Sequence, residues 1–186
     1  MKVSLISVTP KAEENVVYIA RVSSKREDKK SKPEGLLNYL IKHKHWSPFE
    51  HSHLSVEIET SKAIGIQLIR HRSFTFQEFS QRYQNVSLVD EDMFEEIEFR
   101  KQCKDNRQSS TEVHESAGAE AKLILLQIQR LYKGLLEDGV ARETARMILP
   151  LCTKTKIHMT GSIRSWIHFL ELRDDEHAQK EIQLIA

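Results

Sequence analysis

The chain has 186 residues, of which 39% are hydrophobic, so it is long enough for a substantial core, and we expect one domain over residues 1–186. Lys and Arg number 28 and Asp and Glu 27, so the net charge of +1 excludes a global field that would attract nucleic acid or an anionic membrane. The two cysteines form neither a disulfide framework nor a metal-finger spacing, and no apolar run has the length needed to span a bilayer. These features predict a cytoplasmic protein, in the host cytoplasm if the source is viral.

The N-terminal part of the chain shows short strand and helix patterns. Residues 3–8 are β-rich and are followed by Pro10, which predicts an opening strand and a stop. We expect a helix over 13–22 and an exposed loop over the densely charged residues 25–32. Apolar residues spaced as one helical face then predict a second helix that ends near His43.

A strand followed by a capped helix is predicted next. Residues 54–58 alternate apolar and polar side chains, which is typical of a half-buried strand. Ser61 can cap a helix that runs through Ile69, because its hydroxyl can accept from a free backbone N–H of the first turn. Gln67 and Arg70 are three residues apart, so we expect them on one helix face, where they could hold one ligand together.

The second half of the chain is predicted to be mainly helical. We interpret the polar, acid-rich residues 86–118 as a variable surface excursion. Residues 119–139 form the longest clear helical pattern, which indicates a core spine or a subunit interface. Its predicted apolar face consists of Ile124, Ile128, Leu131 and Leu135.

The C-terminal quarter is predicted as helix, strand and helix. A helix over 140–149 is stopped by Pro150, and the threonine-rich residues 153–160 indicate a strand. A further helix begins at residue 161 or 162, and residues 185–186 lie inside an apparent last helix.

The stretch 70–83 has the composition of a ligand site. It combines arginines, a histidine, a glutamate, hydroxyl side chains and aromatic rings, without Gly or Pro. Arginine offers a planar fork of donors for phosphate or carboxylate, and aromatic faces offer stacking area beside it. The pattern therefore favours an anion that carries a flat ring, with a solvated charged helix face as the alternative.

The histidine-rich segment 43–53 raises the question of a metal site. Its four histidines and Glu50 are all possible zinc or iron ligands. No two of the histidines have the helical spacing of a metal motif with a general base between them, and Pro48 interrupts the segment. We expect no metal here and interpret the segment as a structured loop with ring stacking.

The stretch 70–83 closely resembles the signature of the flavin-dependent thymidylate synthases. That pattern is Arg-His-Arg, two residues, Ser, one residue, Asn-Glu, one residue, Ser, one residue, Arg. Thr75 stands where the family usually has Ser, and Gln77 where it usually has Asn. The matching residues are Arg70, His71, Arg72, Glu78, Ser80 and Arg82.

The resemblance extends over nearly the whole chain. Further blocks that are similar to the family occur, in the family's order, at residues 20–23, 45–51, 145–150 and 172–179. It implies an α/β (α+β) fold in which a small, mostly antiparallel sheet is packed by several helices. It also implies a homotetramer whose active sites are shared among subunits.

The resemblance implies the reductive methylation of dUMP to dTMP in dTMP biosynthesis. Methylenetetrahydrofolate would be the one-carbon donor, and FAD reduced by NADPH would be the hydride source. Neither cysteine lies in a block that resembles a catalytic motif, so the residues give little support to covalent thiol catalysis. With only six glycines and no dinucleotide-binding pattern, side chains must hold the flavin.

The same resemblance implies the residue roles. Arg173 would stabilise negative charge that develops on the uracil ring, and Ser80 would either polarise or position that ring, since no adjacent base favours a nucleophile. Arg82 and Arg146 suit the 5′-phosphate. The implied FAD contacts are His45, Ser47, Arg70, His71, Arg72, Glu78, Ser162, Arg164 and His168. The implied nucleotide contacts are Gln67, Arg70, Glu78, Phe79, Ser80, Gln81, Arg82, Arg146 and Arg173.

Two other interpretations stay open from the residues. Stretch 70–83 could be the stacking platform of a nucleic-acid-binding module, which would show salt-dependent affinity for single strands and no bound chromophore. Segment 43–53 could be the centre of a metal hydrolase. Our expectation is dUMP and folate as ligands, without nucleic acid or membrane.

Overall fold

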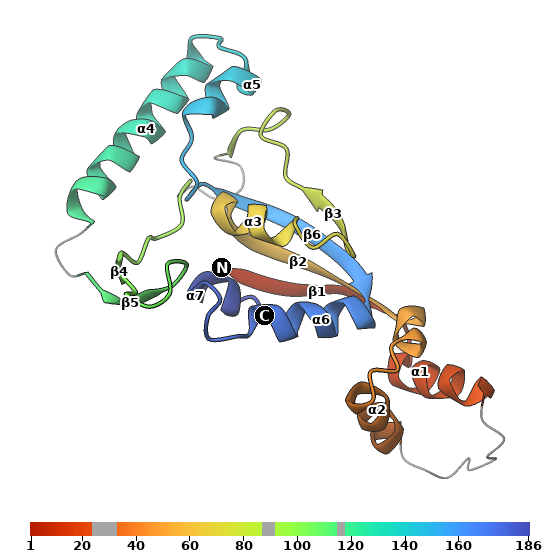
Figure 1. The fold of residues 1–186 in the computed structure, drawn as a ribbon. Helices are drawn as coiled ribbons and strands as arrows, with labels where there is room; N and C mark the ends of the chain where they lie inside the picture. Colours follow the sequence, from red (N-terminus) through yellow and green to blue (C-terminus); the bar gives the residue numbers. More distant parts are fainter. Residues whose placement is uncertain (24–32, 87–91, 115–117) are drawn as a thin grey trace.

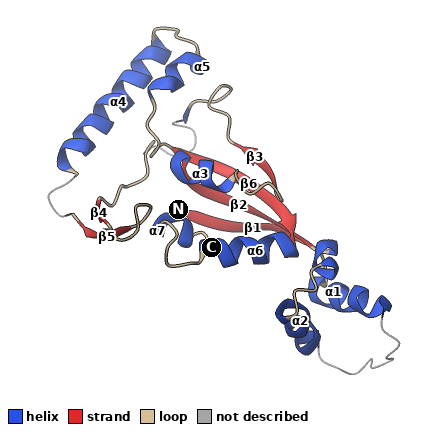
Figure 2. Cartoon of the chain, in the orientation of Figure 1, coloured by secondary structure: helices blue, strands red, loops and turns tan. Residues whose placement is uncertain are grey.

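The computed structural model describes residues 1–23, 33–86, 92–114 and 118–186 and has a four-stranded sheet at its centre. The strand order is β1-β2-β6-β3, and all neighbouring strands are antiparallel. The strands are β1 (Lys2–Val8), β2 (His53–Ser61), β6 (Lys154–Ser162) and β3 (Thr75–Glu78). The expected small antiparallel sheet with several helices is confirmed (Figure 2).

The main core lies on one face of this sheet. Alternate residues of the two central strands, among them Ile58 and Ile157, are fully buried, because helices α3 (Lys62–Leu68) and α6 (Ile163–Arg173) pack against that face. These helices and the segment between them contribute Ile64, Leu68, Phe74, Trp166 and Phe169 to the cluster.

A serine at the end of each central strand begins the helix that follows. Ser61 Oγ accepts from the backbone N–H of Ile64, and Ser162 Oγ accepts from that of Ser165, both at 3.4 Å. The cap predicted at Ser61 is confirmed. Because β2 and β6 are antiparallel, α3 and α6 begin at opposite ends of the sheet, and residues just after α3 lie against the end of α6.

The N-terminal helices form a separate cluster at the end of the sheet where α6 begins (Figure 1). Helix α1 (Ala12–Ala20) continues as the 3-10 turn η1 (Arg21–Ser23), and α2 (Pro33–Lys42) is followed by η2 (Ser47–His51). Val16, Leu40 and Phe49 form its buried centre, with Ile163 and Ile167 of α6 packed against it. Both predicted helices are confirmed, whereas the loop predicted over 25–32 falls outside the described residues.

The expectation of a surface excursion over 86–118 is partly wrong. Val86, Met93 and Phe94 are buried, and Phe94 pairs with Thr153 next to the sheet. A short antiparallel hairpin follows, consisting of β4 (Arg100–Gln102) and β5 (Ser110–Val113). These contacts could not be predicted, because the buried side chains occur singly and do not follow the spacing of a helix or a strand.

Helix α4 (Ala119–Glu137) forms, with α5 (Arg142–Ala145), an arm that projects from the sheet (Figure 1). Of its predicted apolar face, Ile128 and Leu135 pack on a second core around Tyr132, while Ile124 and Leu131 are 47% and 55% exposed. No helix within the described ranges is long and apolar enough to cross a membrane.

Two C-terminal predictions need correction. The helix expected over 140–149 is divided into α5 and the 3-10 turn η4 (Arg146–Ile148), which ends before Leu149 because the residue before Pro150 takes an extended conformation. The last helix, α7 (Lys180–Gln183), ends before residues 185–186. The strand predicted over 153–160 and the helix that starts after Ser162 are confirmed.

Candidate functional site

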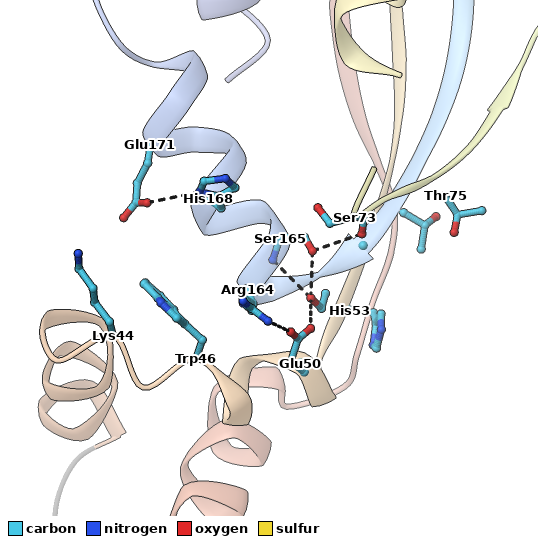
Figure 3. A pocket seen from close by; sticks show the side chains of 13 residues that line it. Lys44, Trp46, Glu50, His53, Ser73, Thr75, Arg164, Ser165, His168 and Glu171 are labelled. Atoms are coloured by element: carbon cyan, nitrogen blue, oxygen red, sulfur yellow. Dashed lines mark hydrogen bonds and ion pairs between the residues drawn. The ribbon is translucent and has the colours of Figure 1, made fainter. Parts of the chain in front are cut away.

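A large pocket lies where β6 ends and α6 begins (Figure 3). Its volume is about 820 Å³, within the range of sites that bind small molecules. Of the predicted FAD contacts, Ser162, Arg164 and His168 line it. The other lining residues are Lys44, Trp46, Glu50, His53, Ser73, Thr75, Thr160, Gly161, Ser165 and Glu171.

Glu50 organises this pocket, and the sequence analysis gave it no role there. Ser162 Oγ donates to Glu50 Oε2 at 2.8 Å, and Arg164 Nη1 forms an ion pair with Glu50 Oε1 (Figure 3). The hydrogen bond from Arg164, and then that from Ser162, lower the pKa of the Glu50 carboxyl. The available signal was that Glu50 is the one carboxylate within the family-like block 45–51.

The pocket wall combines cationic groups with an aromatic ring. Lys44, Arg164 and Trp46 project toward it from two different elements, and His168 lies one turn along α6 from Arg164 (Figure 3). Gly161 also lines the pocket, and its backbone packs directly against Phe74, because a Cβ at this position would lie only 2.5 Å from Cδ1 of that ring. Cations suit a diphosphate and the indole suits a flat ring, so this donor set fits a flavin nucleotide.

His45 and Ser47 do not line this pocket. They line a neighbouring hollow of about 600 Å³, which shares Lys44 and Trp46 with it. The expected ring contacts are present, since the rings of Tyr39 and His43 have centroids 4.2 Å apart. Among the described residues there is no group of three or more His, Cys, Asp or Glu that could hold a metal ion.

A second group of predicted residues lies where the ends of α3 and α6 meet. Arg173 Nε donates to His71 Nε2 at 2.9 Å, so this ring nitrogen of His71 must be unprotonated. Burial lowers the pKa of His71, and the charges of Arg173 and His168 lower it further. Burial and the nearby Arg70 likewise lower the pKa of Arg173.

Gln67 and Arg70 differ in their position relative to α3. Gln67 lies in its last turn, and Nε2 of its amide donates to Oε1 of Gln179 at 2.6 Å. Arg70 follows the end of the helix and is exposed, as is Arg72. The three-residue spacing therefore places the two side chains at a helix end rather than on one continuous helix face.

Glu78 lies away from the large pocket. The strand register pairs Thr75 with Thr160 near the pocket and Glu78 with Ile157, three residues further along. Glu78 Oε1 accepts from Lys62 Nζ and from Thr155 Oγ1, each at 2.8 Å. In this chain Glu78 thus connects the edge strand to the start of α3, whereas Ser162 and Arg164 lie at the other end of β6.

A third group surrounds Glu143 of α5. Arg82 Nη2 lies 3.8 Å from Glu143 Oε2, and Arg146 Nε donates to the Glu143 carbonyl at 3.4 Å. Arg142 Nη1 donates to the carbonyl of Tyr83, also at 3.4 Å. Arg82 and Arg146 therefore both lie next to Glu143, and Arg142 lies beside them in the sequence.

The segment 79–81 connects β3 to this third group. The N–H of Phe79 donates to the Lys156 carbonyl at 2.8 Å, which extends the strand pairing by one residue. The Ser80 carbonyl accepts from Tyr83 and closes a turn. Gln81 is buried, and its Nε2 has no hydrogen-bond partner within the described part of the chain.

Comparison with known proteins identifies the family of this chain. The family model "Thymidylate synthase complementing protein" matches residues 4–186. The chain is 43% identical to a probable flavin-dependent thymidylate synthase of Paramecium bursaria Chlorella virus 1, over 97% of this chain and 88% of the relative. It is 39% identical to the flavin-dependent thymidylate synthase of Synechocystis sp., over 92% of this chain and 79% of the relative.

A third relative comes from Thermosipho melanesiensis. The chain is 38% identical to the flavin-dependent thymidylate synthase of Thermosipho melanesiensis, over 92% of this chain and 76% of the relative. The relatives are thus 38% to 43% identical to this chain over most of both sequences, and the family model matches nearly every residue of the chain. The chain belongs to the thymidylate synthase complementing protein family, to which its five sequence blocks already pointed.

Proposed function

We propose that this chain is a flavin-dependent thymidylate synthase, a methyltransferase that converts dUMP to dTMP. It uses methylenetetrahydrofolate as one-carbon donor, FAD as cofactor and NADPH as reductant. Family membership supports the reaction class, and the relatives from Synechocystis sp. and Thermosipho melanesiensis carry this name, as does the viral relative with the word "probable". Within the chain, the observation that carries the proposal is the contact between Arg173 and His71.

Arg173 is held so that its charge can act on a ring. Its Nε donates to the unprotonated Nε2 of His71 at 2.9 Å. This hydrogen bond orients the guanidinium and leaves the N–H groups of both terminal nitrogens available to a ligand. Arg173 is half-buried and close to Arg70, and within the described part of the chain no carboxylate forms an ion pair with it. A fixed, partly desolvated cation of this kind stabilises negative charge on the uracil ring and makes its fifth carbon more nucleophilic.

The residues around the large pocket are proposed to hold FAD. Arg164 and Lys44 suit the diphosphate, Trp46 offers a stacking face, and Glu50 orients Arg164 and Ser162. His45 and Ser47 would extend this site through the neighbouring hollow. When bound and reduced, the flavin supplies the hydride that completes the methyl group.

The group around Glu143 is proposed to bind the nucleotide phosphate. Arg82, Arg142 and Arg146 are three cationic forks, and a dianion would displace Arg82 from its exposed partner at little cost. Nε2 of Gln81 offers a further donor, because a buried amide nitrogen without a partner gains most from an incoming acceptor.

The visible spectrum of the purified protein tests the function. FAD-loaded protein should show a flavin band that NADPH bleaches under anaerobic conditions, with a different rate when dUMP is present. Addition of methylenetetrahydrofolate should then yield dTMP. Protein that cannot be reconstituted with FAD, or that bleaches without ever forming dTMP, would contradict the proposal.

We further propose a homotetramer with active sites shared among subunits, within one domain over 1–186. The proposal is supported by the position of Ser162, Arg164 and His168 where β6 ends and α6 begins, whereas Arg142 and Arg146 of the proposed phosphate site lie on α5 and η4. Light scattering should report four chains per particle. Mixing Arg164→Ala and Arg146→Ala variants, after dissociation and reassociation, should restore part of the activity if different subunits supply these arginines.

Location and remaining partners stay predictions. We propose that the reaction takes place in the cytoplasm, or in the host cytoplasm if the source is viral, and that neither nucleic acid nor membrane takes part.

A further inference from the structure

Four side chains from distant parts of the sequence form a hydrogen-bonded row that ends at Gln67. Arg100 Nη2 donates to Glu181 Oε1 at 2.6 Å, and Gln179 Nε2 donates to Glu181 Oε2 at 2.8 Å. Gln67 Nε2 then donates to Gln179 Oε1 at 2.6 Å. The row connects the β4–β5 hairpin, α7 and the last turn of α3.

The chemistry of Glu181 fixes the direction of every bond in this row. An amide can present either its oxygen or its nitrogen, and only its partners decide which. A guanidinium can only donate and an ionised carboxylate can only accept, so Glu181 requires the nitrogen of Gln179. The side-chain oxygen of Gln179 therefore faces Gln67, and Gln67 donates to it from its amide nitrogen.

The first two members of the row are well held. The Arg100 side chain is only 10% exposed, and its Nε also donates to Ser110 Oγ at 2.8 Å. Burial raises the pKa of Glu181, but the hydrogen bonds from Arg100 and Gln179 outweigh this effect and leave the pKa below its ordinary value. Glu181 is therefore ionised at neutral pH and acts as a permanent acceptor.

We propose that Glu181, through Gln179, is a positioning residue that makes Gln67 present its carbonyl oxygen to the bound nucleotide. This inference rests on the proposed function, in which Gln67 contacts dUMP. A carbonyl oxygen accepts hydrogen bonds, so through this oxygen Gln67 recognises a donor of the nucleotide, and the phosphate dianion has none. The matching donors are the ring N–H and the sugar 3′-hydroxyl.

The test is a double-mutant cycle on dUMP affinity, measured by calorimetry with FAD-loaded protein. Glu181→Gln keeps the shape but can present a donor to Gln179, so the amides are free to flip. We expect dUMP affinity to fall about fivefold, the value of one ordinary hydrogen bond. In the Gln67→Ala background, Glu181→Gln should add nothing, because its effect passes through Gln67.

Matched variants separate positioning from general loss of structure. Glu112→Gln removes a carboxylate of the hairpin itself, which pairs with Lys101 at 2.7 Å, and should leave dUMP affinity unchanged. Gln179→Met breaks the row at its middle with a side chain of similar length. It should reproduce the non-additivity, and it decides the matter if Glu181→Gln does not fold.

Two analogues identify the donor. 3-Methyl-dUMP lacks the ring N–H, and 2′,3′-dideoxyuridine monophosphate lacks the sugar hydroxyl. Wild-type protein should disfavour one of them against dUMP, and that preference should shrink in both Glu181→Gln and Gln67→Ala.

The outcomes distinguish this inference from the proposed function. Wild-type protein that binds no dUMP overturns both. The positioning role alone is overturned if wild-type protein binds dUMP but Gln67→Ala has no effect. Equal losses from Glu181→Gln with and without Gln67 overturn it as well, because they show a purely structural role.

Discussion

Arg173 needs the particular shape of a guanidinium. One of its nitrogens is used by His71 at 2.9 Å, and the others stay available to a ligand. A lysine offers a single nitrogen on a flexible stem and cannot serve both partners in fixed directions. We therefore expect Arg173→Lys to lower the single-turnover rate of dTMP formation about 100-fold, similar to the loss of one charge-stabilising donor in other enzymes.

The control for this prediction lies on the hairpin. Arg107→Lys changes an exposed arginine outside the proposed site and should leave the rate unchanged. The flavin absorbance of Arg173→Lys should equal that of the wild-type protein. A rate within twofold of the wild type would remove Arg173 from the proposed mechanism.

His71 should make stability depend on pH. Its pKa in the folded protein is below the ordinary value of 6.5, through burial first and then the charges of Arg173 and His168. In the pH range between the folded pKa and 6.5, the unfolded chain binds a proton that the folded chain does not. The free energy of unfolding should therefore fall as pH drops through this range and be fully recovered above it.

Urea unfolding at several pH values measures this effect. His71→Gln retains an acceptor for Arg173 but does not titrate. The difference in stability between wild type and His71→Gln should shift against the wild type as pH falls below about 6.5, because only the wild type then has His71 to protonate. A difference that is constant with pH would contradict the prediction.

At the scale of elements, the junction of β6 and α6 determines the large pocket. Gly161 has no room for a side chain, because an added Cβ would lie 2.5 Å from Cδ1 and 2.7 Å from Cε1 of the buried Phe74. Gly161→Ala should therefore displace this ring or the strand end. We expect a loss of about 1–3 kcal/mol in the free energy of unfolding, as for other overpacked cores.

The matched glycine substitution is in α2. A Cβ at Gly35 would meet nothing within 4 Å, so Gly35→Ala should be neutral or add up to about 1 kcal/mol to stability. Urea unfolding of both variants gives the comparison. If the two alanine variants were equally stable, Phe74 would not constrain the junction.

At the scale of the whole molecule, the α4 arm has an apolar face that is exposed in the described part of the chain. Ile124 and Leu131 are one heptad apart on the helix and are 47% and 55% exposed. In the proposed homotetramer such a face would be buried between subunits. The double variant Ile124→Glu and Leu131→Glu should therefore dissociate the particle in light scattering.

Lys133→Glu is the control for charge. It changes an exposed lysine of the same helix and should leave the particle size unchanged. A double variant that keeps the wild-type mass would show that subunits meet elsewhere.

Local patterns in the sequence were sufficient for most elements. The alternation in residues 54–58 and the hydroxyl of Ser61 predict β2 and the start of α3, because both effects act over a few residues. Local patterns did not predict the parts of the structure that depend on contacts between residues far apart in the sequence. Met93 and Phe94 are buried by segments far along the chain, which no local period records.

The sequence by itself determined the family, the residue types of the candidate site and the order of its main elements. Only the tertiary structure decided which of those residues meet. Glu50 holds Ser162, and Gln67 reaches Gln179, each across 112 positions of the chain. Such pairs depend on strand register and helix placement, which arise from packing the whole chain, so spacing along the sequence does not encode them locally.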